Sequence, residues 1–247
     1  MKVKTILVSQ PTPKSDQSPY QILMDKQKVK IDFRSFIHVE GETAKNVRSQ
    51  KIDFLNFTAV IFTSRNAIDN YFRLAEEMRI TVPDDMNYFC LSEAVAFYLQ
   101  KYVVYRKRKI YVGTRTFDEL LPLIKKHKNE KFLLPCSDKI KDAIPEKLNE
   151  FDINWQKAVL FKTVISDLSD LENVYYDVLV FFSPSGIKSL FQNFPGFKQN
   201  STRIAVFGNT TVKAAEEAGL KIDISAPTKE NPSMAMALEK YIKEVNK

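Results

Sequence analysis

The sequence alternates short apolar runs, rich in valine, isoleucine and phenylalanine, with stretches in which apolar residues recur at helical spacing. Such alternation predicts an α/β fold, because parallel strands need long, usually helical, connections. The strand candidates are Thr5–Ser9, Asp32–Ile37, Ala59–Thr63, Tyr88–Leu91, Lys131–Pro135, Ala158–Val164, Val178–Ser183 and Arg203–Gly208. The helix candidates are Asn66–Glu77, Glu93–Lys101, Phe117–Lys126, Ile140–Glu150, Ile187–Asn193, Thr211–Ala218 and Ser233–Val245.

The length of 247 residues predicts two domains, each large enough to bury a core. A content of 44% hydrophobic and 27% charged residues excludes disordered and collagen-like chains. Purely apolar runs such as Val178–Phe182 are far shorter than the ~20 residues that cross a bilayer. The stretch Ile6–Val8 is too short for the apolar region of a signal peptide. We therefore expect a cytoplasmic protein that does not contact a membrane.

An internal repeat relates the two halves of the chain. The segment Val60–Ile68 aligns without a gap to Leu179–Ile187, at an offset of 119 residues. At an offset of 117 residues, Phe89–Tyr102 lies over Val206–Gly219. The repeat predicts two similar α/β halves.

In each half, a buried strand is expected to end in small hydroxyl residues before a helix begins. This places Ser64 and Ser183 at helix N-termini, and the turn Gly208–Thr211 is a third example. Helix N-termini favour anions because their first N–H groups are unpaired. The simpler interpretation is ordinary helix capping, which serine, threonine and asparagine perform in any α/β protein. Three such turns at the carboxyl ends of strands favour an anion-binding site.

Cysteine and histidine are scarce, with two of each in the chain. Cys90 and Cys136 cannot form a disulfide framework or a four-thiolate zinc site, and we interpret both as small buried apolar residues. His38 and His127 lie in no HExxH or HxH motif. We therefore expect chemistry that depends neither on a histidine-rich metal site nor on a catalytic triad.

Much of the net charge of +7 lies in one segment, in which Lys101 and Arg106–Lys109 supply five positive charges. Tyrosines interleave this run, so it could bind nucleic acid. The alternative is an exposed connection or an edge strand protected by charge. We favour the alternative and expect no nucleic-acid partner, because nucleic-acid-binding proteins normally show a more extended basic stripe.

Several motifs, in order along the chain, resemble those of the uroporphyrinogen-III synthase family. They are Ile6–Pro11 (ILVSQP), Ile61–Ile68 (IFTSRNAI), Leu133–Cys136 (LLPC), Ile144–Leu148 (IPEKL), Phe181–Gly186 (FFSPSG), Ala205–Ala215 (AVFGNTTVKAA), Ala218–Leu220 (AGL) and Ala226–Thr228 (APT). The resemblance covers most of the chain, and the order and spacing of the motifs make it more specific than any one of them.

The resemblance implies two flavodoxin-like, parallel-sheet α/β domains joined by a two-stranded crossing. The first domain would be discontinuous, comprising residues 1–38 and 166–247, and residues 39–165 would form the inserted second domain. The crossing strands would lie near Phe33–His38 and Val159–Val164.

The resemblance also implies an activity: cyclisation of hydroxymethylbilane to uroporphyrinogen III, with inversion of the last pyrrole ring, in tetrapyrrole biosynthesis. The family uses no metal or organic cofactor, and we expect a monomer. The substrate carries eight carboxylates, which hydroxyl and backbone N–H donors can bind. The residues implied to contact it, in a cleft between the domains, are Ser64, Arg65, Asn66, Ser183, Ser185, Gly186 and Thr210. Thr211 would act near the leaving hydroxyl, with its own hydroxyl and N–H facing the substrate.

The chain departs from the family pattern at three places, one of which is Ser9–Pro11 (SQP), where the resemblance implies Thr-Arg-Pro. Phe161 stands at the position where the family has a tyrosine in the crossing strand, and a phenylalanine cannot donate a proton. The turn Leu91–Val95 lacks the glycine and the threonine of the corresponding family turn. Two hypotheses follow: an active synthase, which we favour, and a family member that binds a linear tetrapyrrole or another polyanion without turnover.

Overall fold

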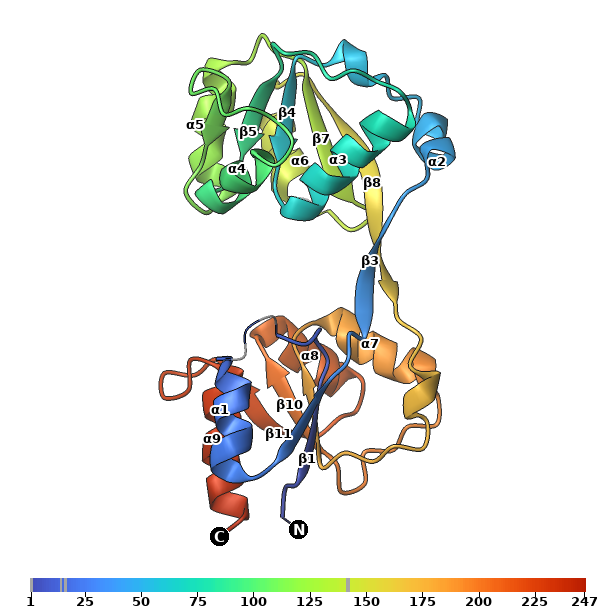
Figure 1. The fold of residues 1–247 in the computed structure, drawn as a ribbon, viewed down its shortest axis with the longest axis vertical. Coiled ribbons are helices and arrows are strands. Elements are labelled where there is room, and N and C mark those ends of the chain that lie inside the picture. The colour runs from blue at the N-terminus through green and yellow to red at the C-terminus, as the bar shows by residue number, and fades with distance from the viewer. Residues whose placement is uncertain (1, 14, 16, 141–142) are drawn as a thin grey trace. The chain divides into compact units, whose positions relative to one another are not determined.

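The structure is a computed structural model, which describes residues 2–13, 15, 17–140 and 143–247. The chain divides into two compact units (Figure 1). Unit 1 combines the residues up to His38 with Ile165–Lys247, and unit 2 is the continuous segment Val39–Val164. Ile165, expected in the inserted segment, falls in unit 1.

Unit 1 is built on a sheet whose described strands lie in the order β11 (Ile222–Ala226), β10 (Arg203–Phe207), β9 (Val178–Phe181), β1 (Thr5–Val8) and β2 (Lys30–Phe33). Each strand is parallel to its neighbours. Helices α1 (Pro19–Gln27) and α9 (Met234–Val245) pack together on one face. Helices α7 (Pro184–Asn193) and α8 (Asn209–Glu217) cover the other face, next to the 3₁₀ turn η2 (Ser169–Leu171).

Unit 2 repeats this design. Its described strands lie in the order β3 (Ile37–Gly41), β8 (Trp155–Ile165), β7 (Phe132–Ser137), β4 (Ala59–Phe62), β5 (Asn87–Cys90) and β6 (Ile110–Val112). The pairs from β8 to β6 are parallel. Helices α3 (Arg65–Glu77) and α4 (Glu93–Leu99) pack on one face, and α5 (Phe117–Lys126) and α6 (Ala143–Glu150) contribute to the apolar core of the other. The short elements α2 (Ala44–Ser49) and η1 (Phe54–Asn56) precede β4.

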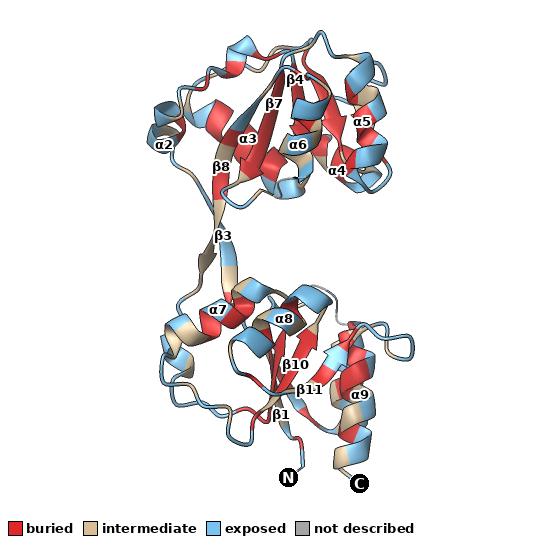
Figure 2. Ribbon diagram, turned by 180° about the vertical axis from the view of Figure 1, so that it is seen from behind, coloured by how far each residue is buried: buried red, intermediate tan, exposed pale blue. Residues whose placement is uncertain are grey.

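The local sequence explains the central elements of each sheet. Strands β4, labelled in Figure 2, and β9 are apolar and buried at every position, because helices cover both faces of a parallel sheet. Helix α3 buries Ala67, Ile68, Tyr71 and Leu74, whose spacing of three and four residues forms one apolar stripe. The α/β class with parallel sheets is therefore confirmed.

The candidate strand Asp32–Ile37 is wrong as a single element. The chain leaves β2 at Phe33 and begins β3 at Ile37. The backbone N–H of Glu42 donates to Leu160 O (2.8 Å), and that of Ser166 donates to Phe36 O (3.0 Å), so β3 runs antiparallel to β8. These two strands contain the points at which the chain passes from one unit to the other. The candidate helix Ile140–Glu150 is described from Ala143 as α6, and residues 141–142 lie outside the described residues.

The internal repeat is confirmed by the topology. Strands β4 and β9 begin 119 residues apart, and so do helices α3 and α7. Spatially, β6-β5-β4-β7-β8 in unit 2 matches β11-β10-β9-β1-β2 in unit 1. The order along the chain differs, because β7 and β8 follow the repeated segment whereas β1 and β2 precede it. The units therefore share one arrangement with a circularly permuted chain order.

Candidate functional site

Two serines begin equivalent helices at the carboxyl edges of the two sheets. Ser64 Oγ accepts a hydrogen bond from Ala67 N (3.2 Å) at the start of α3, and Ser183 Oγ accepts one from Gly186 N (3.2 Å) at the start of α7. Both serines are therefore helix caps, as the simpler interpretation predicts. Each hydroxyl keeps its own proton, so a capping serine can still donate to a carboxylate.

The substrate-contact residues expected around these caps differ in what they can offer. Arg65 and Asn66 are exposed, and Ser185 is half-buried. Gly186 is buried, and its N–H is already bonded to Ser183. Gly186 therefore has a packing role in this structure, close to the Phe181 ring and to Ser9 Oγ.

The third turn, at the start of α8, is open. Gly208 occupies the cap position with φ of 87° and ψ of 145°, a conformation that is essentially restricted to glycine. It has no side chain, and no other described side chain caps this helix. Asn209 and Thr210 are exposed in the first turn. This helix start can therefore accept an anion through its unpaired N–H groups and the Thr210 hydroxyl.

Thr211 does not lie as expected. The residue is 1% exposed, and its backbone N–H donates to Gly208 O (3.0 Å). The expectation that both its hydroxyl and its N–H face the substrate is therefore wrong for this structure. The cause is geometric: the third residue of the helix turns inward over the core, and Thr210 is left as the outward hydroxyl.

Phe161 lies on β8 with its residue only 7% exposed, and it belongs to the apolar core beneath α3 and α4. Its carbonyl accepts a hydrogen bond from Asp138 N (3.1 Å). In this structure the position therefore contributes to packing in unit 2.

A cavity of about 430 Å³ in unit 1 brings together groups that sequence reasoning missed. Its lining includes Arg34, just after β2, together with Thr12, His38 and Ser166. Arg34 Nη2 is 2.8 Å from Asp170 Oδ1, and His38 Nδ1 is 3.0 Å from Ser166 Oγ. Guanidinium, imidazole and hydroxyl groups around one opening can bind a carboxylate.

At the carboxyl edge of unit 2, one cation is held by an aromatic ring. The guanidinium of Arg65 lies 5.3 Å from the centroid of the Tyr98 ring, and Tyr98 Oη donates to Asp69 (2.9 Å). Helix α4, which carries Tyr98 near its C-terminal end, has Glu93 in its first turn, where the side chain complements the helix dipole. That carboxylate makes the second turn of unit 2 less suited to an anion than its counterpart in unit 1.

The remaining candidates for covalent or metal chemistry are accounted for by packing. Cys90 and Cys136 are free and buried, as predicted, and burial raises the pKa of Cys90 to about 12 and that of Cys136 to about 11. His127 packs against Tyr111 and bonds to Leu123 O (2.8 Å), in the layer of α5. Among the described residues, no cluster of three or more His, Cys, Asp or Glu side chains could hold a metal ion.

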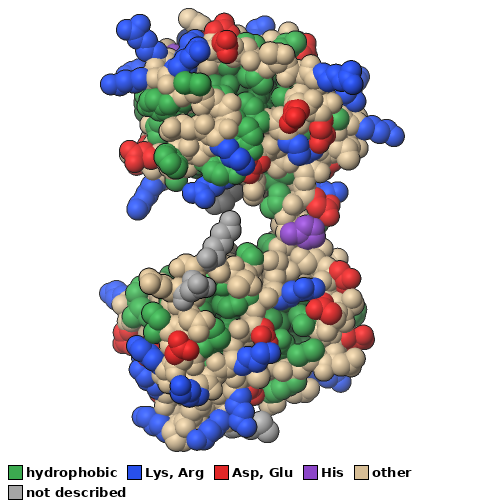
Figure 3. Space-filling view, in the orientation of Figure 1, with side chains coloured by type: hydrophobic (Ala, Val, Ile, Leu, Met, Phe, Trp, Pro, Cys, Tyr) green, Lys and Arg blue, Asp and Glu red, His purple; other side chains and the backbone are tan. Residues whose placement is uncertain are grey.

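The surface of both units carries many lysine and arginine side chains, as Figure 3 shows for one face. Together with the net charge of +7, this favours association with an anionic ligand. None of the helices that the structure describes is long and apolar enough to cross a membrane.

Fold and site together define a duplicated parallel α/β protein with hydroxyl-rich turns and cations at the carboxyl edges of its sheets. The family model described as "Uroporphyrinogen-III synthase HemD" matches residues 23–236. The chain therefore belongs to the uroporphyrinogen-III synthase family, whose members are enzymes of tetrapyrrole biosynthesis.

Individual relatives agree with this assignment. A uroporphyrinogen-III synthase from Chlorobaculum parvum is 24% identical over 98% of this chain and 100% of its own length. The crystal structure of uroporphyrinogen-III synthetase from Helicobacter pylori has a TM-score of 0.61 at 21% identity, covering 98% of this chain and 99% of its own. A mutant uroporphyrinogen III synthase from Thermus thermophilus has a TM-score of 0.56 at 14% identity, with coverage of 98% and 99%. These structures support the same fold.

Proposed function

We propose that this protein converts linear hydroxymethylbilane into uroporphyrinogen III, with loss of water and inversion of the last pyrrole ring. The observation that carries the proposal is the match to the family model over residues 23–236. The alternative, binding without turnover, is not favoured, since the relatives named above are themselves synthases or synthetases.

The first task of the site would be to hold the substrate's eight carboxylates. In unit 1, Arg34, the exposed N-terminus of α8 with Thr210, and the Ser183 hydroxyl suit this task. In unit 2, Arg65 and the Ser64 hydroxyl suit it. Asn66 and Ser185 complete the set of side chains at the two helix starts. Binding several carboxylates at fixed places folds a flexible chain into one geometry, which lowers the entropic part of the barrier.

The chemical steps need little help from acid or base groups. Loss of the terminal hydroxyl leaves an azafulvene, and attack through the substituted carbon of the last ring gives a spiro intermediate that rearranges to isomer III. Without positioning, the azafulvene closes directly to isomer I. We propose that Thr211, buried beside Thr210, positions the first turn of α8, and that Phe161 shapes unit 2 rather than delivering a proton.

The test is an isomer assay. Purified protein is incubated with freshly prepared hydroxymethylbilane, the products are oxidised, and isomers I and III are separated and compared with a protein-free control. Isomer III should dominate the products. An isomer I fraction equal to that of the control would contradict the proposed activity. In that event, calorimetry with uroporphyrinogen III under anaerobic conditions would separate a non-catalytic binder from a protein that does not bind the product.

The architecture supports further parts of the proposal. We propose that the two units are flavodoxin-like domains, because the strands of unit 1, numbered along the chain, lie in the order 2-1-3-4-5 and unit 2 matches that arrangement. We also propose that the protein is a cytoplasmic monomer that works without a cofactor and without nucleic-acid or membrane partners. Sedimentation equilibrium should return the mass of one 28.5 kDa chain.

A further inference from the structure

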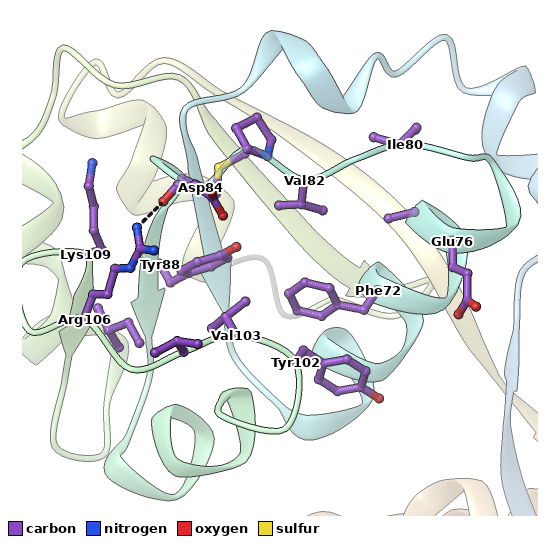
Figure 4. A pocket seen from close by; sticks show the side chains of 15 residues that line it. Phe72, Glu76, Ile80, Val82, Asp84, Tyr88, Tyr102, Val103, Arg106 and Lys109 are labelled. Carbon is purple, nitrogen blue, oxygen red and sulfur yellow. Dashed lines mark hydrogen bonds between the residues drawn. The ribbon is translucent and has the colours of Figure 1, made fainter.

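A second cavity of about 430 Å³ lies in unit 2, at the amino ends of β5 and β6. Figure 4 shows its aromatic lining, in which Phe72 from α3, Tyr88 from β5 and Tyr102 from the segment after α4 lie around one space. Arg106 and Lys109 stand on one side of this space, and Glu76 lies at the opposite side. The turns of the proposed active site follow the carboxyl ends of the strands, so this cavity belongs to the other end of the sheet.

The wall of the cavity is an addition that distinguishes unit 2 from unit 1. The connection between α4 and β6 has ten residues, Gln100–Lys109, whereas the equivalent connection between α8 and β11 has four, Ala218–Lys221. The longer connection is the basic and aromatic run singled out in the sequence. It supplies Tyr102, Val103, Val104, Arg106 and Lys109 to the cavity. The repeat therefore identifies the cavity as a special feature of unit 2 and not a property of the shared fold.

The two cations of the wall are held in place by neutral partners. Arg106 Nη1 donates to Asp84 O (3.3 Å), the contact dashed in Figure 4, and Lys109 Nζ donates to Asp85 O (2.7 Å). Backbone carbonyls fix these side chains without cancelling their charge. Lys107 and Arg108, between them in the sequence, are exposed and do not line the cavity.

Between these charged groups, the cavity is lined by aromatic and aliphatic side chains and by the hydroxyl-bearing Tyr88. Phe72 and Tyr102 stack with ring centroids 4.6 Å apart, and Val104 is 79% exposed beside them. Tyr88 is 5% exposed, and burial, with the nearby charge of Asp84 as a further cause, raises its pKa to about 12. Its hydroxyl therefore stays protonated and can donate a hydrogen bond. A flat apolar ring fits this lining, and the cations at one side favour an acidic group on that ring.

We propose that this cavity is a second binding site, which takes a small aromatic carboxylate with its ring against the stacked pair Phe72–Tyr102 and Tyr88, and its carboxylate toward Arg106 and Lys109. The negative charge of the Asp84 side chain repels the ligand's carboxylate and limits the affinity of the site for it. The site is separate from the proposed synthase function and would exist whether or not that function holds.

The test uses 1-naphthoate as the probe and 1-naphthamide as its neutral isostere, both measured by calorimetry on the full chain. Naphthoate should bind at least fivefold more tightly than the amide. Amide cross-peaks in ¹H–¹⁵N NMR spectra should shift for residues 102–110 and around Tyr88, and those of Gly208–Val212 should stay in place.

Two matched double variants separate the cavity from a general charge effect. Arg106→Gln with Lys109→Gln should weaken naphthoate binding at least fivefold and leave amide binding unchanged. Lys107→Gln with Arg108→Gln removes the same charge from the same segment, and it should change the binding of neither naphthoate nor naphthamide. Asp84→Asn should strengthen naphthoate binding. All variants involve exposed or half-buried side chains, and a melting temperature within a few degrees of the wild type verifies their fold.

Three results would overturn the proposal. Naphthoate and naphthamide could bind equally, naphthoate could fail to bind at millimolar concentration, or both double variants could weaken binding alike. Equal weakening, accompanied by salt-dependent binding of a single-stranded oligonucleotide, would instead identify the basic run as a nucleic-acid surface.

Discussion

The carboxyl edges of the two units share a scaffold and differ in charge. In unit 1, α8 begins with glycine, asparagine and threonine, and a cavity beyond the end of β2 is lined by Arg34 and His38. In unit 2, the equivalent helix α4 begins with Glu93, whose negative charge in the first turn disfavours a substrate carboxylate at that helix N-terminus. A duplicated fold therefore does not imply a duplicated site.

The amino ends of the two sheets also differ, and there it is unit 2 that carries the additional feature. Unit 2 has the longer connection Gln100–Lys109 and the cavity that it walls, and unit 1 closes the same connection in four residues. Repeats tolerate such changes because loops lie on the surface and can lengthen at small thermodynamic cost. We infer that unit 1 dominates in binding substrate carboxylates. The following predictions test that asymmetry, from the largest expected effect to the smallest.

Gly208→Ala should have the largest effect. A side chain at φ 87° and ψ 145° costs about 1–3 kcal/mol of strain, and relief of that strain would move the first turn of α8. A displacement of about 1 Å at a positioning site can cost ~10²-fold in rate. We expect a loss of this size in isomer III formation.

Gly219→Ala is the matched control for Gly208→Ala. Gly219 also has a positive φ, 75°, with open space around its Cβ position, but it follows the other end of α8. It should lower the melting temperature and leave the isomer ratio intact. Equal losses of isomer III in the two variants would show that general destabilisation explains both.

Arg34→Gln should raise KM for hydroxymethylbilane by roughly tenfold with a smaller change in kcat. The expected size follows from the ~1.5–3 kcal/mol of a charge-assisted hydrogen bond, taken at its lower end because Arg34 is 44% exposed. Steady-state kinetics with isomer separation measures it. Asp170→Asn keeps the arginine and removes its ion-pair partner, so it should not raise KM. A rise in KM for Asp170→Asn alone would place the effect in loop structure and not in substrate binding.

Glu93→Gln should change KM only slightly and in the opposite direction to Arg34→Gln. Removing the acid should lower KM about twofold, because an anionic substrate is no longer repelled. It should also lower the free energy of unfolding by about 0.3–1 kcal/mol, the usual contribution of an acid in the first turn of a helix. Steady-state kinetics measures the change in KM, and denaturant unfolding measures the change in the free energy of unfolding. An increase in KM would show that Glu93 takes part in substrate binding.

Phe161→Tyr should have the smallest effect on the reaction. The ring is 7% exposed, so the added hydroxyl would either be accommodated or cost about 1–3 kcal/mol if left unpaired. We expect an unchanged isomer ratio and a rate within several-fold of the wild type, measured beside the melting temperature. A rate increase of 10²-fold or more would instead show that a proton donor at this position serves the reaction.

The central strands and the capping serines of α3 and α7 could be predicted from the sequence, and the strands β6 and β11 at the sheet edges could not. Buried strands such as β4 and β9 form continuous apolar runs, and Ser64 and Ser183 mark the helices that follow. Strand β6 has three residues after a basic run, and β11 alternates polar and apolar residues at the edge of its sheet, so neither gives the pattern of a buried strand.

The candidate site could likewise be predicted only where its residues are neighbours in the sequence. The hydroxyl turns are local in sequence and were predicted, whereas Arg34 and His38 were missed. Their partners Asp170 and Ser166 lie 136 and 128 residues away along the chain, and only the folded sheet brings them together. The inward turn of Thr211 is likewise a consequence of packing, which no local motif encodes.

Hydrogen exchange with and without uroporphyrinogen III, under anaerobic conditions, tests the central asymmetry most directly. The account predicts slower exchange at the start of α8, residues 208–212, and after β2, residues 34–38. Weaker protection is expected at 64–67, and unchanged exchange at 92–95 and 100–109. Protection confined to 92–95 or 100–109, with 208–212 and 34–38 unchanged, would contradict the claim that unit 1 dominates in binding the substrate's carboxylates.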